Sequence, residues 1–206
     1  MPTKGERTKA HIVSAAAPIF NERGFAGTSM SDILEATGLE KGGIYRHFES
    51  KDDLAVAAFD YAVAVLEVRQ RRALEKAKTP LDRLFACIDV FRSSLTNPAI
   101  RGGCPMLNTA IDADDTHPAL RTRARRAVAH WQQLIADIAV EAKAHGELGA
   151  ATDPEVLASV ITSSLEGAIM VSRLLHDPRH MDRVVDHLRA WLFSFTTAPQ
   201  AASIRS

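Results

Sequence analysis

Apolar residues recur at three- and four-residue intervals along almost the whole chain, and this spacing constrains the fold more than any other feature. Ile12, Ala16, Ile19 and Phe20, for example, share one face of a first helix, and Gly24 is suited to end it. No run of alternating β-branched residues with hairpin turns accompanies this spacing. We therefore predict an all-α fold.

Capping residues and prolines place the helix boundaries. Thr28 or Ser29 is suited to cap a second helix, Ser50 caps one that begins at Lys51, and Pro80 occupies the first turn of another. The helices expected after the first span about 29–37, 41–47, 51–78, 80–96, 104–114, 116–145, 153–176 and 181–195.

Composition excludes several classes of protein. The formal net charge is zero, and the two cysteines, Cys87 and Cys104, form neither a disulfide framework nor a zinc pattern. No stretch approaches the roughly 20 uncharged apolar residues of a membrane span, and the polar start is unlike a signal peptide. We expect a cytoplasmic protein that does not bind membranes.

Residues 28–54 place two short helices on either side of a tight turn. Gly38 can adopt the positive φ that such a turn needs. Ile33, Leu39, Ile44 and Phe48 can pack on the first helix as a small core. This arrangement predicts a helix-turn-helix module, whose second helix enters the major groove of DNA.

The second helix of this module carries Gly42 and Gly43, each of which costs up to about 1 kcal/mol relative to Ala in a helix. A helix without side chains at these positions lets its backbone approach base edges and phosphates closely. The alternative is that the segment is only a loop.

The segments GFAGTSMSDI (24–33) and GLEKGGIYRHFESKDDL (38–54) resemble the N-terminal signature of the TetR/AcrR family of bacterial repressors. The resemblance covers about the first quarter of the chain. It implies an all-helical homodimer that binds a palindromic operator and releases it when a small molecule binds the C-terminal domain. Glu40 departs from the Ser or Thr that is commoner in the family at this position.

The predicted DNA contacts divide into two kinds. Helix N-termini and polar side chains hold phosphates, whereas side chains of the groove helix read bases. The expected phosphate contacts are Thr28, Ser29, Tyr45, His47 and Lys51, and the expected base contacts are Lys41, Gly42, Gly43 and Arg46.

Several of these roles have alternatives. The alternative for Tyr45 is packing in the core, and the alternative for His47 is a C-terminal cap of the helix. Glu40 either accepts from a cytosine amine or pairs within the protein. The basic N-terminal residues either form an arm that reaches DNA or a solvated tail; they are Lys4, Arg7, Lys9 and His11. Residues 1–51 hold seven Lys and Arg against six Asp and Glu, so geometry and dimerisation must supply much of the affinity.

The C-terminal part is a long helical region in which apolar and polar residues alternate, and such a region suits a ligand pocket between helices. We expect the ligand to contact Phe85, Ile88, Cys104, Met106, Leu107, Asn108, Trp131, Glu166 and Met170. Asn108 and Glu166 are the strongest of these, because a polar group on an apolar helix face needs a partner. For most of the others, ordinary core packing is the alternative.

Cys104 supports a second hypothesis about the signal. Residues 101–108 resemble a stretch of TetR-like proteins that sense electrophiles through one cysteine, and a helix N-terminus with Arg101 nearby stabilises a thiolate. The alternative function is therefore a thiol-based sensor of electrophiles or oxidants on the same DNA-binding scaffold. Cys87, on an amphipathic helix, is expected in the core.

Apolar stripes on the last two helices are expected to form a dimer interface, as the resemblance implies. The stripes are Val156, Val160, Leu165, Ile169 and Leu174, and Val184, Leu188, Trp191, Leu192 and Phe195. The small residues Ser163, Ser164, Gly167 and Ala168 allow close helix contact.

We therefore predict a helix-turn-helix DNA-binding domain over residues 1–51, a helical ligand-binding and dimerisation domain over 52–198, and a flexible tail over 199–206. The expected partners are double-stranded operator DNA, a small-molecule inducer and a second copy of the chain. We expect no cofactor, no metal and no enzymatic activity, since no GxSxG, HExxH or P-loop motif is present. The rivals are a helical enzyme with a metal at Asp112, Asp114, Asp115 and His117, and a helical bundle with no DNA role.

Overall fold

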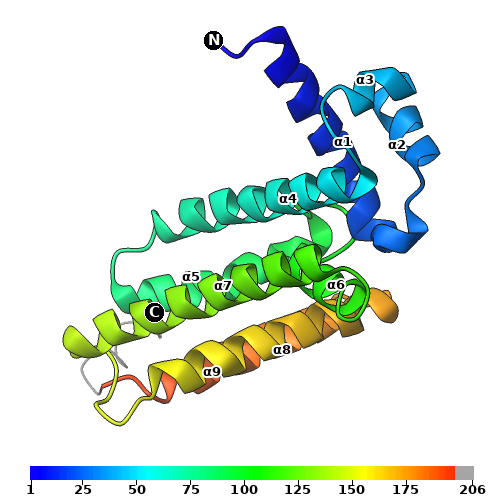
Figure 1. Ribbon diagram of the computed structural model, residues 1–206. Coiled ribbons are helices and arrows are strands. Elements are labelled where there is room, and N and C mark those ends of the chain that lie inside the picture. The colour runs from blue at the N-terminus through cyan, green and yellow to red at the C-terminus, as the bar shows by residue number, and fades with distance from the viewer. Residues whose placement is uncertain (198–206) are drawn as a thin grey trace. The chain divides into compact units, whose positions relative to one another are not determined.

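The computed structural model describes residues 1–197, and these form nine helices and no strand (Figure 1). The helices are α1 (Lys4–Gly27), α2 (Met30–Thr37), α3 (Lys41–Tyr45), α4 (Lys51–Leu74), α5 (Pro80–Thr96), α6 (Pro105–Asp112), α7 (Pro118–Ala144), α8 (Pro154–Leu174) and α9 (Arg179–Phe193). The predicted all-α fold is confirmed. The predicted tail, 199–206, lies outside the described residues.

Side-chain caps explain where many of the helices begin. The Ser29 hydroxyl accepts from the Asp32 amide ahead of α2, the Thr79 hydroxyl accepts from Asp82 ahead of α5, and Asp153 caps α8. The helix ends agree less well with the prediction, since α3 ends at Tyr45 and α4 at Leu74. The basic residues of the expected arm lie in α1 itself, which begins at Lys4.

The chain packs into two compact units. Unit 1 comprises Met1–Glu67 and Ala99–Ala127, and unit 2 comprises Val68–Pro98 and the residues from Val128 onward. Both α4 and α7 contribute residues to each unit. This division by packing differs from the predicted functional boundary after Lys51, which stays a prediction.

Unit 1 has a core that joins the first four helices to a later segment. Ile12, Ile33, Ile44 and Leu54 have no exposed surface, and Ile100, from the connection between α5 and α6, packs with them. The Gly24 backbone has φ 72° and interrupts α1 one turn before its end. This positive φ was predicted for Gly24, although the helix resumes as far as Gly27.

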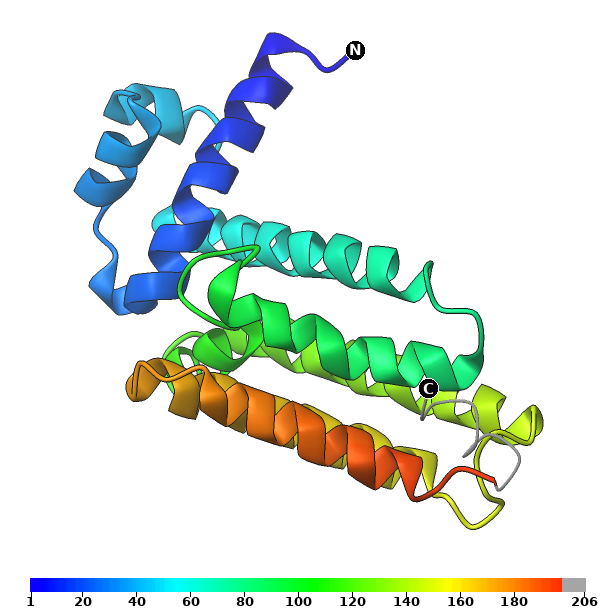
Figure 2. The ribbon, with the colours of Figure 1, turned by 180° about the vertical axis from the view of Figure 1, so that it is seen from behind.

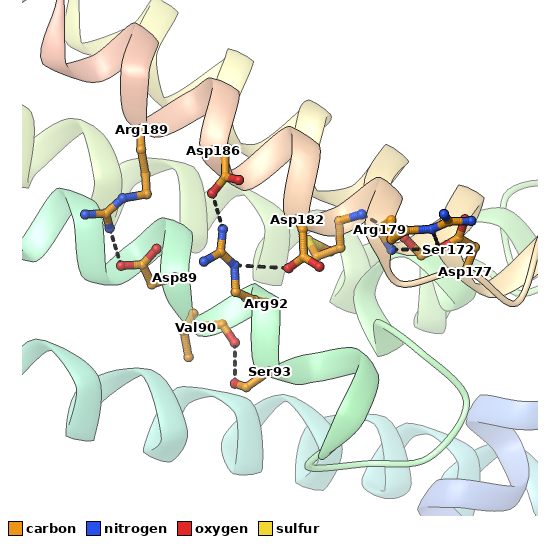
Figure 3. Close-up of polar contacts among 11 residues, drawn as sticks. Asp89, Val90, Arg92, Ser93, Ser172, Asp177, Arg179, Asp182, Asp186 and Arg189 are labelled. Carbon is orange, nitrogen blue, oxygen red and sulfur yellow. Dashed lines mark hydrogen bonds and ion pairs between the residues drawn. The ribbon is translucent and has the colours of Figure 1, made fainter.

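Unit 2 packs α5, α8 and α9 against one another, and α7 joins them in the same group of helices (Figures 1 and 2). A row of ion pairs links α5 to α9 along one side. Arg92 pairs with Asp182 at 3.3 Å and with Asp186, while Arg189 pairs with Asp89 (Figure 3). These side chains are largely exposed, so each pair contributes only about 0–1 kcal/mol.

The apolar face of α8 differs from the predicted stripe. Leu165 and Ile169 are buried inside unit 2, and so are Leu188 and Leu192 of α9. These four side chains face inward because they form the core in which α8 and α9 pack together. The residues left on the outer face of α8 follow a spacing of four and three; they are Val156, Val160, Ser163, Gly167, Met170 and Leu174, here called the α8 stripe.

Among the described residues, α8 is also the one helix long and apolar enough to cross a membrane by length and composition. The helix is not an uncharged stretch, because Glu155, Glu166 and Arg173 lie within it and every 18-residue window of it contains two of them. In the folded protein 44% of the window is buried. The remaining apolar surface belongs largely to the α8 stripe.

Candidate DNA interface

A tight turn sets α3 against α2. Gly38 has φ 65°, as predicted, and its N–H donates to the Leu34 carbonyl at 3.0 Å. The ring of His11 donates from Nε2 to the Thr37 carbonyl at 3.0 Å, which ties α1 to the C-terminal end of α2. The sequence analysis placed His11 in an arm, and no local pattern indicates a partner 26 residues away.

The α3 helix turns one side chain inward and leaves the others outside. Ile44 has no exposed surface, whereas Lys41, Gly42 and Arg46 are exposed and Tyr45 is 41% exposed. A Cβ added at Gly42 would meet no atom within 4 Å, so this part of the helix is bare. Tyr45 is therefore outside the core, under the Lys41 ammonium at 5.7 Å.

Other predicted positions on α3 are less open. A Cβ at Gly43 would lie 3.5 Å from the Leu39 side chain, so Gly43 faces its own turn rather than open space. His47 follows the C-cap residue Arg46 and is half-buried. Glu40 precedes α3 and makes no side-chain cap.

The N-terminus of α2 carries a capping box with an added cation. The hydroxyl and the amide of Ser29 donate to the Asp32 carboxylate at 2.6 and 2.8 Å, and Arg23 donates to it at 2.6 Å. These donors, Ser29 first, lower the pKa of Asp32 to about 2. The Ser29 side chain is exposed, with its hydroxyl facing Asp32.

Thr28 does not have the predicted exposed position. Its residue is 1% exposed, and its hydroxyl donates to the Gly24 carbonyl at 2.7 Å. The Thr28 hydroxyl stabilises the backbone at the break in α1 instead of facing solvent. We therefore revise the expected role of Thr28 from phosphate contact to structural support.

Lys51 stands at the start of α4 on an aromatic platform. Its Nζ lies 4.3 Å from the centroid of the Phe25 ring, and the centroids of the Phe25 and His117 rings lie 4.6 Å apart in a T-shaped arrangement. His117 bonds Asp52 at 3.2 Å through Nε2, and its Nδ1 accepts from the Leu120 amide. These contacts restrict where the Lys51 ammonium can lie.

The backbone of Phe25 is held from α6. Its N–H donates to the Asp112 carboxylate at 2.7 Å. Asp112 and His117 thus have structural partners at the place where a metal site was the rival interpretation, and no three-ligand group suited to a metal exists among residues 1–197. Phe25, Asp112 and His117 were not predicted to support Lys51, because they lie up to 66 positions from it.

Asn108 has partners within unit 1. Its amide nitrogen donates to the Asn21 backbone carbonyl at 3.0 Å, to the Asn21 side-chain oxygen at 3.0 Å and to the Gly102 carbonyl at 2.8 Å. Asn21 in turn donates to the carbonyls of Arg101 and Gly103. The structure therefore gives Asn108 a role in joining α6 to α1, and its contact with a ligand stays a prediction.

The other predicted ligand residues are divided between the units. Cys104, Met106 and Leu107 lie in unit 1 with Asn108, whereas the rest belong to unit 2. In unit 2, Phe85 lies under the Arg189 guanidinium at 4.7 Å and Met170 is 51% exposed on the α8 stripe. Those whose side chains remain inside unit 2 are Phe85, Ile88, Trp131 and, partly buried, Glu166.

The two thiols are both buried. Burial raises the pKa of Cys87 to about 12, which keeps it protonated, as a core cysteine should be. Cys104 is 6% exposed at the N-cap of α6.

Comparison with family models matches both parts of the chain. Residues 12–58 match "Bacterial regulatory proteins, tetR family", and residues 80–188 match "Tetracyclin repressor-like, C-terminal domain". The two matches cover the predicted helix-turn-helix and most of the helices after α4.

Relatives and solved structures agree with these models. An HTH-type transcriptional regulator of Mycobacterium tuberculosis is 30% identical over 90% of this chain and 94% of its own length, and the HTH-type transcriptional repressor DhaR of Mycobacterium sp. is 23% identical over 85% and 87%. The crystal structure of a TetR transcriptional regulator from Chloroflexus aurantiacus is 44% identical, with a TM-score of 0.91 over 94% of this chain and 98% of that one. A TetR-family regulator from Cytophaga hutchinsonii is 33% identical, with a TM-score of 0.89 over 96% and 99%.

Proposed function

Because this chain belongs to the TetR family of DNA-binding, helix-turn-helix transcriptional regulators, we propose that it is a homodimeric repressor released from a palindromic operator by a small molecule. The observation that carries the proposal is the exposed surface of α3, where Lys41, Tyr45 and Arg46 surround the bare backbone of Gly42. The family is one of transcriptional regulators, and we propose a cytoplasmic protein without enzymatic activity.

The residues of this surface have separate roles in the proposed complex. Arg46 and Lys41 reach base edges, and the bare turn at Gly42 lets the backbone approach the groove. Ser29, Tyr45, His47 and Lys51 hold phosphates. Repression is supported by the relative DhaR, which is named a repressor.

A second copy of the chain is the proposed occupant of the α8 stripe. The stripe is uncharged and runs from Val156 to Leu174, about 27 Å along the helix. A Cβ added at Gly167 would meet no atom within 4 Å, which leaves room for a partner helix to approach closely. Two copies place two α3 helices about 34–36 Å apart, or a multiple of it, in successive major grooves.

Release follows from linkage between ligand and DNA. The ligand must bind more tightly to the dimer whose two α3 helices are spaced wrongly for DNA than to the dimer that fits DNA. A coupling free energy of about 1–3 kcal/mol suffices. Helix α4 is the proposed lever, because it starts at Lys51 and continues without a break to Leu74 in unit 2.

A mobility-shift titration with the DNA upstream of the gene tests the proposal. We expect a shifted complex that contains two chains, is weakened by added salt and requires an inverted repeat. Failure to bind any upstream fragment, or binding by a monomer at micromolar concentration, would contradict it.

The thiol-sensor alternative is separated from ligand release by Cys104→Ser. If the variant still releases DNA with the same inducer, the pocket is the sensor. If the variant no longer responds to an oxidant or electrophile that releases the parent protein from DNA, the Cys104 thiol is the sensor.

A further inference from the structure

Unit 2 contains a cavity of about 330 Å³ between the last turn of α5 and the α8–α9 connection. Leu95 and Thr96 line it from α5, and Ser172, Arg173 and residues 176–178 line it from the end of α8 and the connection. The volume lies at the lower end of the range in which pockets hold small molecules. None of the ligand residues predicted from the sequence, all of which lie within residues 1–197, lines this cavity, so it is a separate candidate site.

The cavity wall includes an unusual backbone conformation. Among residues 1–197, His176 is the one residue other than glycine with a positive φ, 50°. It follows the end of α8, where its N–H donates to the Arg173 carbonyl at 3.3 Å and the Asp177 N–H donates to the Ser172 carbonyl at 3.0 Å. Glycine is the usual residue at such a helix end. A strained residue of this kind is a reason to look for a functional site beside it.

The Ser172 hydroxyl on the cavity wall accepts a hydrogen bond but has no acceptor for its own proton within residues 1–197. Ser172 is 4% exposed, and its Oγ accepts from the Met181 N–H at 3.0 Å. By contrast, Ser93 and Ser94 of α5 donate their protons to the Val90 carbonyl, at 3.0 and 3.3 Å. Native interiors pair most buried polar groups, and an oxygen of a ligand in the cavity would supply the missing acceptor.

The charges on the cavity wall leave one cation without a partner. Arg179 donates from Nε to both oxygens of Asp177, at 2.9 and 3.0 Å, and these bonds lower the pKa of Asp177 to about 2. Asp177 is therefore ionised and already paired (Figure 3). Arg173 is exposed and makes no ion pair within residues 1–197. Its free guanidinium favours a ligand with an anionic group.

The rest of the wall selects the kind of anion. Leu95 and Pro178 offer hydrocarbon, which an organic anion can cover with an apolar body but a hydrated inorganic anion cannot use. Ser172 and Arg173 are consecutive, with Cα atoms about 3.8 Å apart, and both line the same cavity. One carboxylate has two acceptor oxygens and can therefore accept from both side chains.

The α5 side of the cavity is tied to α4. The Arg69 guanidinium of α4 donates to the Asn97 carbonyl at 2.6 Å and to the Ser93 hydroxyl. These two partners lie on either side of Leu95 in the sequence. A ligand that packs on Leu95 therefore acts beside the point where α4 is held, and α4 continues from there back to Lys51.

We propose that this cavity is a second effector site, which binds an apolar monocarboxylate through Arg173 and Ser172 and passes its effect to α4 through Arg69. The inference goes beyond the proposed function and, as a site for an effector of DNA binding, rests on it. The sequence analysis selected none of these three residues, because their roles depend on a cavity that only the fold creates.

Calorimetric titration of the full-length protein without DNA tests the ligand chemistry. The probes are 4-phenylbutyrate, its uncharged near-isostere 4-phenylbutanamide, and the cation 4-phenylbutylamine. We expect the acid to bind about fivefold or more tightly than the amide, because hydrogen bonds to a carboxylate are about twice as strong as those to a neutral acceptor. The amine should bind more weakly still. Absence of saturable binding of the acid, or equal binding of acid and amide, overturns the proposal.

Variants then assign the preference to the cavity. Arg173→Gln should make the affinities for acid and amide nearly equal, whereas the control Arg183→Gln, at an exposed position on α9 outside the cavity, should retain the preference. An unchanged preference in Arg173→Gln excludes that guanidinium from the site.

The apolar wall has its own variant. Leu95→Ala should weaken acid and amide alike by about tenfold, because it removes hydrocarbon that packs on the body of both probes. The control Leu175→Ala changes a residue that is 57% exposed and outside the cavity, and it should leave both affinities unchanged. Equal affinities in Leu95→Ala and the parent protein would place the probe elsewhere and overturn the proposal.

Mobility shifts with the upstream DNA test the effector role. Saturating 4-phenylbutyrate should change operator affinity by about fivefold or more, the lower end of ordinary allosteric coupling. Arg69→Gln should still bind the probe but lose this change, whereas the control Arg72→Gln, exposed on the same helix, should keep it. Operator affinity that does not respond to a saturating probe, or a full response in Arg69→Gln, overturns the inference.

The outcomes separate this inference from the proposed function. If the dimer binds its operator but the probe neither binds with the acid preference nor changes operator affinity, the inference fails and the function stands. If the upstream DNA is not bound, the proposed function fails, and the titrations alone decide whether the cavity binds a carboxylate.

Discussion

The interiors of the two units treat polar side chains in different ways. In unit 1, Asn21, Thr28 and Thr37 are buried, and each is bonded within the unit. In unit 2, Glu147 and Ser172 are buried and bonded in the same way, whereas the Trp131 indole N–H and the Thr162 hydroxyl are equally buried and have no hydrogen-bond partner. The buried polar groups of unit 1 fix the segments around α3, whereas unit 2 contains two buried polar atoms, Trp131 Nε1 and Thr162 Oγ1, that make no hydrogen bond within the described residues.

This difference teaches what each unit is built for. A surface that reads DNA needs fixed exposed side chains, and a bonded interior supplies the fixed frame. The small-molecule site that we propose for unit 2 needs polar groups that the chain itself leaves available, at some cost in stability.

The largest expected effect is that of Asn21→Ala. The substitution removes the donors to the Arg101 and Gly103 carbonyls and one acceptor of Asn108, so we expect unfolding free energy to fall by about 3 kcal/mol. Denaturant unfolding at fixed protein concentration measures it, with the exposed Asn97→Ala as control. A decrease in unfolding free energy below about 1 kcal/mol would mean that the hydrogen bonds of Asn21 do not hold unit 1 together.

Gly167→Leu should act on the dimer and spare the protomer. A Cβ added at Gly167 meets no atom within 4 Å, so a side chain there starts from open space on the α8 stripe and extends toward the proposed partner. We expect dimer dissociation to increase at least about tenfold, roughly 1.4 kcal/mol, and operator binding to weaken with it. Sedimentation velocity measures this, with Ala129→Leu on the exposed side of α7 as control. An unchanged dimer would place the interface elsewhere.

Substitutions on the DNA surface should separate affinity from specificity without changing stability. Arg46→Ala should alter base preference, with about 1–3 kcal/mol lost at one position. Lys51→Ala and Tyr45→Phe should weaken binding to all sequences alike, and Lys51→Ala should reduce the salt dependence by about one phosphate contact per chain. Mobility shifts at several salt concentrations distinguish the two. A change of specificity in Lys51→Ala with an unchanged salt slope would reverse these roles.

The smallest effect concerns acid. Since the folded pKa of Asp32 is about 2, below its ordinary value of 3.8, its contribution is complete above about pH 4 and disappears as pH falls toward 2. The Tm difference between the parent protein and Asp32→Asn should therefore shrink over this interval. A difference that is constant from pH 5 to 2.5 would show that the carboxylate does not stabilise the capping box in solution.

Local signals made much of the architecture predictable. Ser29 and Ser50 mark helix starts because a cap depends only on residues two or three positions away. Gly38 was predictable for the same reason, since its positive φ is a local requirement of the turn.

Features that depend on distant residues were not predictable. The sequence places Thr28 at a helix N-terminus, but only the fold shows that its hydroxyl bonds Gly24. Likewise, the apolar stripe of a helix does not tell which of its two sides faces the protein's own core. Leu165, expected on the dimer face, is buried in unit 2, while Met170, expected in the ligand pocket, is exposed on the α8 stripe. The support of Lys51 by Phe25 and His117 joins three segments that no spacing rule connects.

The make-up of unit 1 has a consequence for synthesis of the protein. The chain leaves the ribosome from its N-terminus, so residues 1–67 are complete while 99–127 are still missing. At 5–20 residues per second, Ile100, Asn108 and Asp112 follow within roughly 2–9 s, and until then the sites they occupy on α1 are unfilled. A nascent chain in this interval carries the α3 residues without their complete frame. The ability to grip DNA is therefore expected to arise only after the middle of the chain has been made.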